Sequence, residues 1–243
     1  MANILVIDIE TAPHKVYAWG LWDQRIALNQ IVEPGYTLCF AAQWYGKREI
    51  IFDSVRNGTK KMLVHVHKLL DEADAVVHYN GTSFDIPTLR GEFMGAHMKP
   101  PSPFAQIDLI KVARSTRMAS RKLDYLAGVL GLGHKLEHKG MELWRKCMDG
   151  DEASWRTMER YNKRDVRLTS EVYKELRPWI KGHPNLSNGE VACPTCGSEN
   201  VQARGKQKTL TMAYRRFQCQ ECGSWFRDTK AAHRHANVTG IAA

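Results

Sequence analysis

The sequence predicts an α/β fold in which helices pack on a sheet, followed by a small second unit near the C-terminus. Three strand-like apolar segments occupy the first quarter of the chain, and helix-like and strand-like segments alternate after them. Two Cys-x-x-Cys pairs follow position 190. The 243 residues can form one large domain or one medium and one small domain, and a 43% apolar fraction with 25% charged residues is that of an ordinary globular protein.

Apolar runs and turn formers define the first elements. The run Ile4-Leu5-Val6-Ile7 is uninterrupted, as in a buried strand, and apolar residues from Met62 to Leu70 recur at helical spacing. Gly46-Lys47-Arg48 separates two further strand-like runs and predicts a hairpin turn. The expected elements are a strand over 3–8, an irregular segment over 13–35, a hairpin of 37–45 and 49–52, and a helix over 60–70.

The following elements alternate between strand and helix. A short apolar run ends at Asn80-Gly81, and Thr82 or Ser83 can cap the helix that follows. Glycines after Leu130 close a later helix. The expected elements are a strand over 75–79, a helix to about Ala96, a short strand into Asp108, a helix over 122–132 and helices over most of 141–180.

Two domains are expected. Turn-forming residues dominate positions 181–190, which predicts a linker. The expected division is a first domain over 1–180, the linker over 181–190, a small domain over 191–230 and a tail over 231–243.

Four carboxylates arrive in three clusters along the chain. Asp8 and Glu10 are two apart on a predicted strand, so both point to the same side of the sheet. Asp85 comes at the start of a predicted helix. Asp165 lies four residues after Tyr161 on another predicted helix, so Tyr161 and Asp165 share a helix face. Each cluster alone is more often a turn, a cap or a solvated helix face. Four acids converging on one point would repel strongly without divalent cations between them, which suits two-metal hydrolysis of a phosphodiester.

The order and spacing of these clusters resemble the three exonuclease motifs of the DEDD superfamily, the DnaQ-like, proofreading-type nucleases. Asp8-Ile9-Glu10 matches D-x-E, the segment from Asn80 to Asp85 matches N-x-x-x-F-D, and the segment from Tyr161 to Asp165 matches Y-x-x-x-D. Position 160 is arginine rather than histidine, so the third motif is of the tyrosine, or DEDDy, type. The resemblance covers roughly residues 1–180 and implies an RNase H-like mixed sheet flanked by helices.

The resemblance implies a role for each motif residue. Asp8 would be shared by two Mg²⁺ or Mn²⁺ ions, Glu10 and Asp165 would complete the site that activates water, and Asp85 would hold the second ion. Tyr161 would hydrogen-bond the attacking water and orient it, because a tyrosine with a pKa near 10 is a poor base at neutral pH.

Further residues are expected to contact the substrate. The resemblance places Thr11, Asn80 and Phe84 near the terminal nucleotide; the alternative for Phe84 is a core aromatic at a helix start. Asp108 and Asp124 are expected to be structural or substrate-side residues, since the four-acid set is complete without them.

The two cysteine pairs predict a structural zinc site. Each pair supplies two thiolates to one tetrahedral ion, and strand-like segments over 210–218 and from 223 onward resemble the hairpins of zinc ribbons. A redox role is the less favoured alternative. Basic residues of this unit, including Arg215 and Arg216, are expected to contact phosphate, unless the unit packs on the core or binds protein. The predicted ligands are Cys193, Cys196, Cys219 and Cys222.

Charge and hydropathy indicate the partner and the compartment. The net charge is +9, and residues 181–243 hold nine Lys/Arg against four Asp/Glu, which favours a nucleic-acid partner. No stretch approaches the ~20 apolar residues of a membrane span, and no signal peptide is visible, so the expected location is cytoplasmic.

The sequence thus predicts a metal-dependent 3′-5′ exonuclease that acts on DNA with a free 3′ end, with a replication or repair protein as a further candidate partner. Two alternatives stay open. One is a 3′-5′ exoribonuclease, because the same acids occur in both. The other is a nucleic-acid-binding adaptor with an inactive nuclease core.

Overall fold

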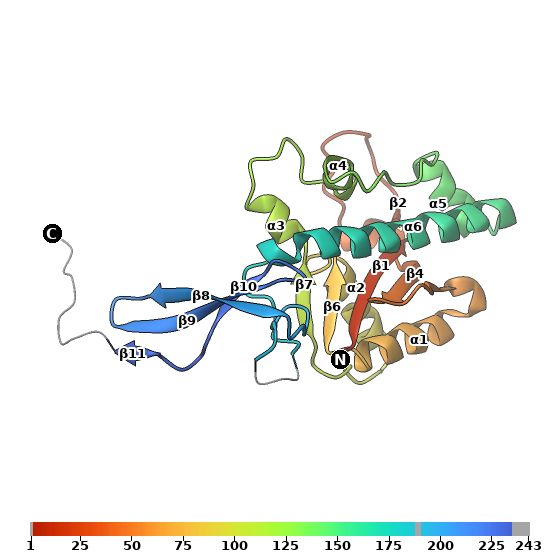
Figure 1. Ribbon diagram of the computed structural model, residues 1–243. Coiled ribbons are helices and arrows are strands. Elements are labelled where there is room, and N and C mark those ends of the chain that lie inside the picture. Colours follow the sequence, from red (N-terminus) through yellow and green to blue (C-terminus); the bar gives the residue numbers. More distant parts are fainter. Residues whose placement is uncertain (1, 188–190, 235–243) are drawn as a thin grey trace. The chain divides into compact units, whose positions relative to one another are not determined.

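The computed structural model describes residues 2–187 and 191–234 (Figure 1). The chain divides into two compact units. We call residues 3–172 the sheet unit, and the second unit, made mainly of residues from 173 onward, the hairpin unit. Part of the expected linker, residues 188–190, and the expected tail from residue 235 lie outside the described residues.

Figure 1 labels most of the helices and strands. Up to the end of α6 they are β1 (Ile4–Thr11), β2 (Lys15–Val16), β3 (Ile31–Glu33), β4 (Thr37–Trp44), β5 (Ile51–Ser54), α1 (Thr59–Asp71), β6 (Ala75–His78), α2 (Asp85–Gly95), β7 (Ala105–Asp108), α3 (Ile110–Arg114), α4 (Leu123–Val129), α5 (Met141–Met148) and α6 (Glu152–Leu176). Short 3₁₀ turns occupy Leu28–Gln30, Val55–Asn57 and Arg177–Trp179. The hairpin unit adds β8 (Val201–Lys208), β9 (Met212–Cys219), β10 (Trp225–Arg227) and β11 (His233–Arg234).

A five-stranded mixed sheet forms the centre of the sheet unit. Its strand order is β5-β4-β1-β6-β7, with β1 in the middle. β4 pairs antiparallel with β1 and β5, whereas β6 pairs parallel with β1 and β7. This mixed sheet, flanked by helices, confirms the fold class that the sequence predicts.

Alternate residues of β1 face opposite sides of the sheet. Leu5, Ile7 and Ile9 are buried in a core that includes residues of α1 and α2. The even-numbered residues therefore point to the opposite face, where α5 and α6 contribute to a second core. Figure 1 shows α6 crossing this face. Because helices cover both faces, β1 reads in the sequence as an unbroken apolar run.

Helix α6 packs its buried residues on the face of the sheet opposite α1 and α2. One row of its buried residues recurs every three or four positions, which is the spacing of a stripe along a helix, and further buried residues lie beside this row. Neither α6 nor any other helix in the described parts of the chain has the length and apolar character needed to cross a membrane. The stripe consists of Trp155, Met158, Asn162, Asp165, Thr169, Val172 and Leu176.

The observed boundaries differ from the expected ones where turn chemistry decides them. Helix α4 ends at Val129 rather than 132, since Gly131 takes a left-handed φ of 72° that ends the helix. Helix α2 begins at Asp85 with Phe84 at its N-cap position, one or two residues later than a cap at Thr82 or Ser83 would place it. The segment expected to be irregular contains the short ribbon of β2 and β3.

The hairpin unit is a small antiparallel sheet. β8, β10 and β11 all pair with β9, which agrees with the strand expected over 210–218. β8 was not expected, because all but one of its residues are exposed and no run of large apolar side chains marks it.

Candidate active site

The carboxyl end of β1 carries the first two acids. Ile7 and Ile9, which alternate with Asp8 and Glu10 along β1, are buried against α1 and α2. Asp8 and Glu10 therefore both lie on the opposite face, which α6 covers. The two-residue period of the strand thus separates the acids from the apolar core.

Helix α6 brings the third acid to the same place. Asp165 lies in the buried stripe of α6 and is almost inaccessible to solvent. One carboxylate oxygen from each of Asp8, Glu10 and Asp165 lies within 4.8 Å of the other two. Residues more than 150 positions apart in the sequence therefore form one acidic cluster, as the motif spacing predicts.

Asp85 lies beside this cluster but outside the group of three. It is the first residue of α2 and is buried, and its Oδ1 accepts a hydrogen bond from the backbone N–H of Ile9 at 3.0 Å. Ile9 sits between Asp8 and Glu10 on β1. The contact holds Asp85 against the strand that carries the other acids, and its role as a metal ligand stays a prediction.

Asn162 contacts the acidic cluster, although none of the three motifs predicts a role for it. Its side chain is fully buried, and its Nδ2 donates to Oδ2 of Asp8 at 2.7 Å and to the backbone oxygen of Asp8 at 3.3 Å. These contacts fix the orientation of the Asp8 carboxylate. A signal existed in the sequence, because Asn162 is a polar residue at a position of the buried stripe of α6.

Lys135 is a second residue that the motif search missed. Its Nζ lies 2.6 Å from Oδ2 of Asp165 and donates to the hydroxyl of Tyr161 at 3.1 Å. The lysine comes from the segment after α4, 26 residues before Tyr161. It places one positive charge against the acidic cluster, and no regular spacing in the sequence indicates this contact.

Burial and mutual repulsion raise the pKa values of the acids. Burial, and then the neighbouring carboxylates, raise the pKa of Asp8 well above its usual range. Burial and the charge of Asp165 raise the pKa of Glu10 to about 8, and burial raises the pKa of Asp85 to about 6. Burial also raises the pKa of Asp165, an effect that the charge of Lys135 opposes.

The residues of the cluster fit divalent cations such as Mg²⁺ or Mn²⁺. These cations prefer carboxylate oxygens, and the cluster offers three of them at mutual distances suited to a shared ion. Oδ1 of Asp165 is buried and has no hydrogen-bond partner among the described residues, so none of them compensates its desolvation by a hydrogen bond. A cation would supply that compensation and offset the repulsion among the acids.

The predicted substrate residues lie on or beside the elements that carry Glu10 and Asp85. Thr11 is the last residue of β1 and is partly exposed. Asn80 follows β6 with a left-handed φ of 69°, and its backbone N–H donates to Asp108 at 2.8 Å. Phe84 immediately precedes Asp85 and is 44% exposed, which excludes the alternative that it is a core aromatic.

Asp108 and Asp124 hold loops rather than joining the cluster. Asp108 accepts hydrogen bonds from the backbone of Asn80 and Thr82, and Asp124 accepts one from the backbone N–H of Lys135 at 2.7 Å. Both loops lead to residues of the site. The two aspartates thus hold loops beside the site, and whether they also face a substrate stays a prediction.

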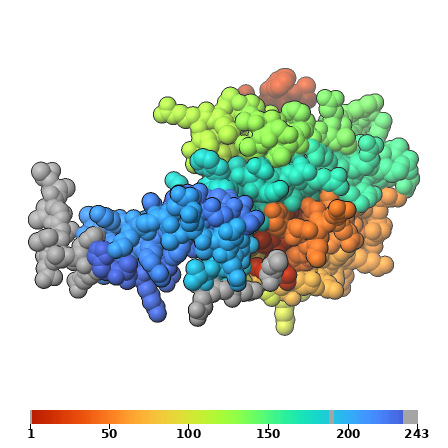
Figure 2. Space-filling view, in the orientation of Figure 1, coloured from red at the N-terminus to blue at the C-terminus, as the bar shows by residue number. Residues whose placement is uncertain are grey.

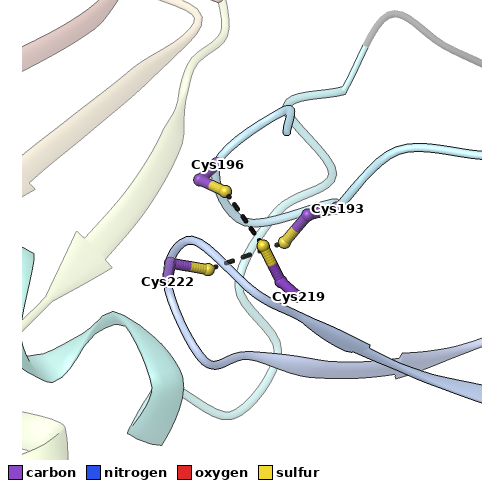
Figure 3. Close-up of side chains that lie close together, drawn as sticks. All are labelled: Cys193, Cys196, Cys219 and Cys222. Carbon is purple, nitrogen blue, oxygen red and sulfur yellow. Dashed lines mark hydrogen bonds between the residues drawn. The ribbon is translucent and has the colours of Figure 1, made fainter. Parts of the chain in front are cut away.

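The four cysteines of the hairpin unit converge on one point (Figure 3). The Sγ atoms of Cys193 and Cys222 are 3.7 Å apart, and those of Cys196 and Cys219 are 3.6 Å apart. A tetrahedral zinc ion with Zn–S bonds of about 2.3 Å needs sulfur atoms about 3.8 Å apart. The four thiols therefore fit one zinc ion.

Arg215 and Arg216 lie on β9, and both are exposed. Arg215 donates to Oδ2 of Asp228 at 2.7 Å, and Arg216 donates to the backbone oxygen of Arg204 and stacks over the ring of Trp225. Internal partners hold both guanidinium groups, and the Asp228 pair reduces the charge that Arg215 offers. Their predicted contact with phosphate stays a prediction.

Comparisons with known proteins agree with this geometry. The model of a family of the RNase H superfamily matches residues 5–177, and the chain belongs to that superfamily. Its structure is similar to that of the family B DNA polymerase from the hyperthermophilic archaeon Pyrobaculum calidifontis, with a TM-score of 0.54 and 18% identity over 74% of this chain. The match covers 25% of the polymerase chain, and at this identity it shows the fold alone. No curated protein matches the chain. Membership of the superfamily supports a nuclease that binds nucleic acid and uses divalent metals.

We expect the metal-free acidic cluster to make stability depend on pH. Glu10 has a pKa of about 8 in the folded protein and about 4.3 in an unfolded chain, so the folded state holds a proton over this range. That contribution is full below about pH 4.3 and disappears as the pH rises through 8. The melting temperature without Mg²⁺ or Mn²⁺ should therefore fall between pH 5.5 and 8.5, and by less in Glu10→Gln. Equal falls in both proteins would contradict the raised pKa.

Proposed function

We propose that this protein is a metal-dependent 3′-5′ exonuclease of the DEDDy type that acts on DNA. The observation that supports it most is the cluster of Asp8, Glu10 and Asp165 at the end of the central strand of an RNase H-like sheet, with Asp85 held beside it. The direction of cleavage and the choice of DNA rest on the resemblance of the three motifs.

The acids would hold two Mg²⁺ or Mn²⁺ ions. Asp8 would be shared between them, Glu10 and Asp165 would complete one site, and Asp85 would complete the other. Bound ions of this kind activate water and stabilise the charge on the phosphate and the leaving oxygen. The amide of Asn162 would keep Asp8 in a fixed orientation, because it already donates to the Asp8 carboxylate at 2.7 Å.

Tyr161 would orient the attacking water. Burial and the charge of Asp165 raise the pKa of Tyr161 above its usual range, so its hydroxyl keeps its proton at neutral pH. It can donate a hydrogen bond but is a poor base. Lys135 stays charged, since Asp165 and Tyr161 raise its pKa although burial alone would lower it. Its charge reduces the repulsion between the cluster and an approaching phosphate.

The terminal nucleotide would contact Thr11, Asn80 and Phe84. Phe84 supports this, because a phenylalanine that is 44% exposed next to a buried aspartate offers a ring for a base to stack on. Asn80 offers an amide at the turn that leads to α2.

The hairpin unit would hold one structural zinc ion through Cys193, Cys196, Cys219 and Cys222, and would contact phosphate through Arg215 and Arg216. Thiolates select zinc, whereas the carboxylates of the acidic cluster select harder ions. The two metal sites therefore have different donor chemistry and should not compete for the same ion.

Digestion of end-labelled substrates tests the proposal directly. DNA and RNA oligonucleotides with a label at either end would be incubated with the protein and Mg²⁺ or Mn²⁺, with Asp8→Ala as the inactive control. Stepwise loss of nucleotides from the 3′ end of DNA is the expected result. Cleavage of RNA alone would establish the exoribonuclease, and binding without cleavage would establish the adaptor.

Asp8→Ala and Asp165→Ala should each reduce hydrolysis by at least about 10²- to 10³-fold, since each removes a charge that holds the cations. The melting temperature should not fall sharply, because removing one acid relieves repulsion. The matched control is Glu72→Ala, an exposed carboxylate at the end of α1, which should keep full activity. Near-normal cleavage by Asp165→Ala would remove this residue from the site.

Tyr161→Phe should reduce the rate by about 10- to 1000-fold, a smaller effect than loss of an acid, because only an orienting hydrogen bond is removed. The measurement is single-turnover cleavage of a short DNA strand with Mg²⁺ present. A variant with the rate of the unmodified protein would show that the hydroxyl takes no part in the reaction.

Purified protein should contain one tightly held zinc ion per chain, measured by elemental analysis after dialysis. Cys219→Ser/Cys222→Ser removes two of the four thiols and should leave no tightly held zinc. Cys147→Ala removes a buried cysteine of the sheet unit and should keep the ion. Zinc that survives the double substitution would contradict the four-cysteine site.

A further inference from the structure

The segment from α3 to the start of α4 carries an unusual density of positive charge. Between Leu109 and Leu123 the sequence contains no acidic residue and five basic ones. All five side chains are exposed. We call residues 111–122 the basic loop; its basic residues are Lys111, Arg114, Arg117, Arg121 and Lys122.

These charges have no acidic partner within the described residues. None of the five lies within 4.0 Å of a carboxylate there, although ion pairs are frequent elsewhere in the sheet unit. Five like charges on a dozen residues repel one another, so a loop of this kind gains stability when an anion binds. The density of charge points to a ligand with several negative groups.

Two contacts fix the basic loop beside the turn that leads to Asp85. The hydroxyl of Tyr79 donates to the backbone oxygen of Arg121 at 2.7 Å, and Nη2 of Arg114 donates to Oδ1 of Asn80 at 3.4 Å. Tyr79 and Asn80 form the turn after β6 that leads to Asp85. Figure 1 shows the connection between α3 and α4 standing clear of the sheet, and Figure 2 shows this lime-green segment on the molecular surface beside α4.

The position matters because the acidic cluster repels the substrate that it would cleave. A polyanionic strand whose end enters a group of carboxylates needs positive charge along its remaining phosphates. The basic loop provides that charge next to the turn that carries Asn80. Arginine adds a planar group that binds two phosphate oxygens at once.

We propose that the basic loop binds the phosphates of the strand whose end lies in the acidic cluster. The ligand class is a phosphodiester backbone of several nucleotides, contacted through charge and without reading of bases. This inference rests on the proposed nuclease function and adds a binding surface in the sheet unit, separate from the arginines of the hairpin unit.

The test compares two double substitutions that remove the same charge. Lys111→Gln/Lys122→Gln alters the basic loop, and Lys60→Gln/Lys61→Gln alters two exposed lysines of α1. Binding of a fluorescent 20-nucleotide single-stranded DNA would be measured by anisotropy against salt concentration, without Mg²⁺ or Mn²⁺ so that no cleavage occurs. Loss of two phosphate contacts should make the log–log salt dependence shallower by about 1.4 in the loop variant. The α1 variant should match the unmodified protein.

A second pair of variants guards against a disturbed fold. Arg117→Gln/Arg121→Gln should weaken binding and flatten the salt dependence in the same way, whereas Arg117→Lys/Arg121→Lys keeps the charge and should keep the salt dependence. Melting curves of all variants would show that they are folded. The proposal would be overturned if the salt dependence were the same in all three glutamine double variants, Lys111/Lys122, Arg117/Arg121 and the control Lys60/Lys61. An acidic protein would then be the next candidate partner of the basic loop.

The proposed nuclease activity is tested separately. Hydrolysis of the p-nitrophenyl ester of thymidine 5′-monophosphate by the unmodified protein with Mn²⁺ involves a single phosphate and reports on the acidic cluster alone. If the ester and DNA both resist cleavage but the loop variants lose salt dependence, the exonuclease proposal fails and the basic loop stands as a nucleic-acid site. If the ester is cleaved but the loop variants bind normally, the nuclease activity stands and the basic-loop proposal fails.

Discussion

The repulsion among several buried carboxylates is the constraint on which the site depends. Such a cluster is stable only if other groups offset the charge, and the structure draws those groups from three separate elements. The amide of Asn162 comes from α6, the N–H of Ile9 comes from β1 itself, and the ammonium of Lys135 comes from the segment after α4. Burial and the neighbouring carboxylates still raise the pKa values of Asp8 and Glu10, so the compensating groups offset the charge only in part.

The fold meets this constraint by dividing β1 between two environments. One face of the strand is buried against α1 and α2, and the other carries Asp8 and Glu10 toward α6. Helix α6 repeats the arrangement, because its buried stripe is apolar except where Asn162, Asp165 and Thr169 face the sheet. The core and the site are thus built from the same two elements by their periods of two and 3.6 residues.

The sequence predicts the parts of this structure that repeat or that match a motif. The strand over 3–8, the hairpin around Gly46 and the convergence of Asp8, Glu10 and Asp165 all follow from spacing. Lys135 does not, because its contact with Asp165 depends on how a loop without regular structure returns to the sheet. β8 escaped prediction because a strand exposed on both faces needs no apolar residues, and α4 ended early because a glycine φ overrides helix spacing.

The order of the acidic cluster and the proposed zinc site along the chain has a consequence for synthesis. Every residue of the acidic cluster precedes the first zinc-site cysteine, Cys193, by at least 28 positions. Chains emerge from the ribosome N-terminus first, so the sheet unit can complete its core and its cluster before any of the four clustered cysteines of the hairpin unit is available. In a cell short of zinc, newly made chains would therefore contain a folded sheet unit joined to an unmetallated hairpin unit. The sensitivity of this protein to zinc supply should be confined to its last third.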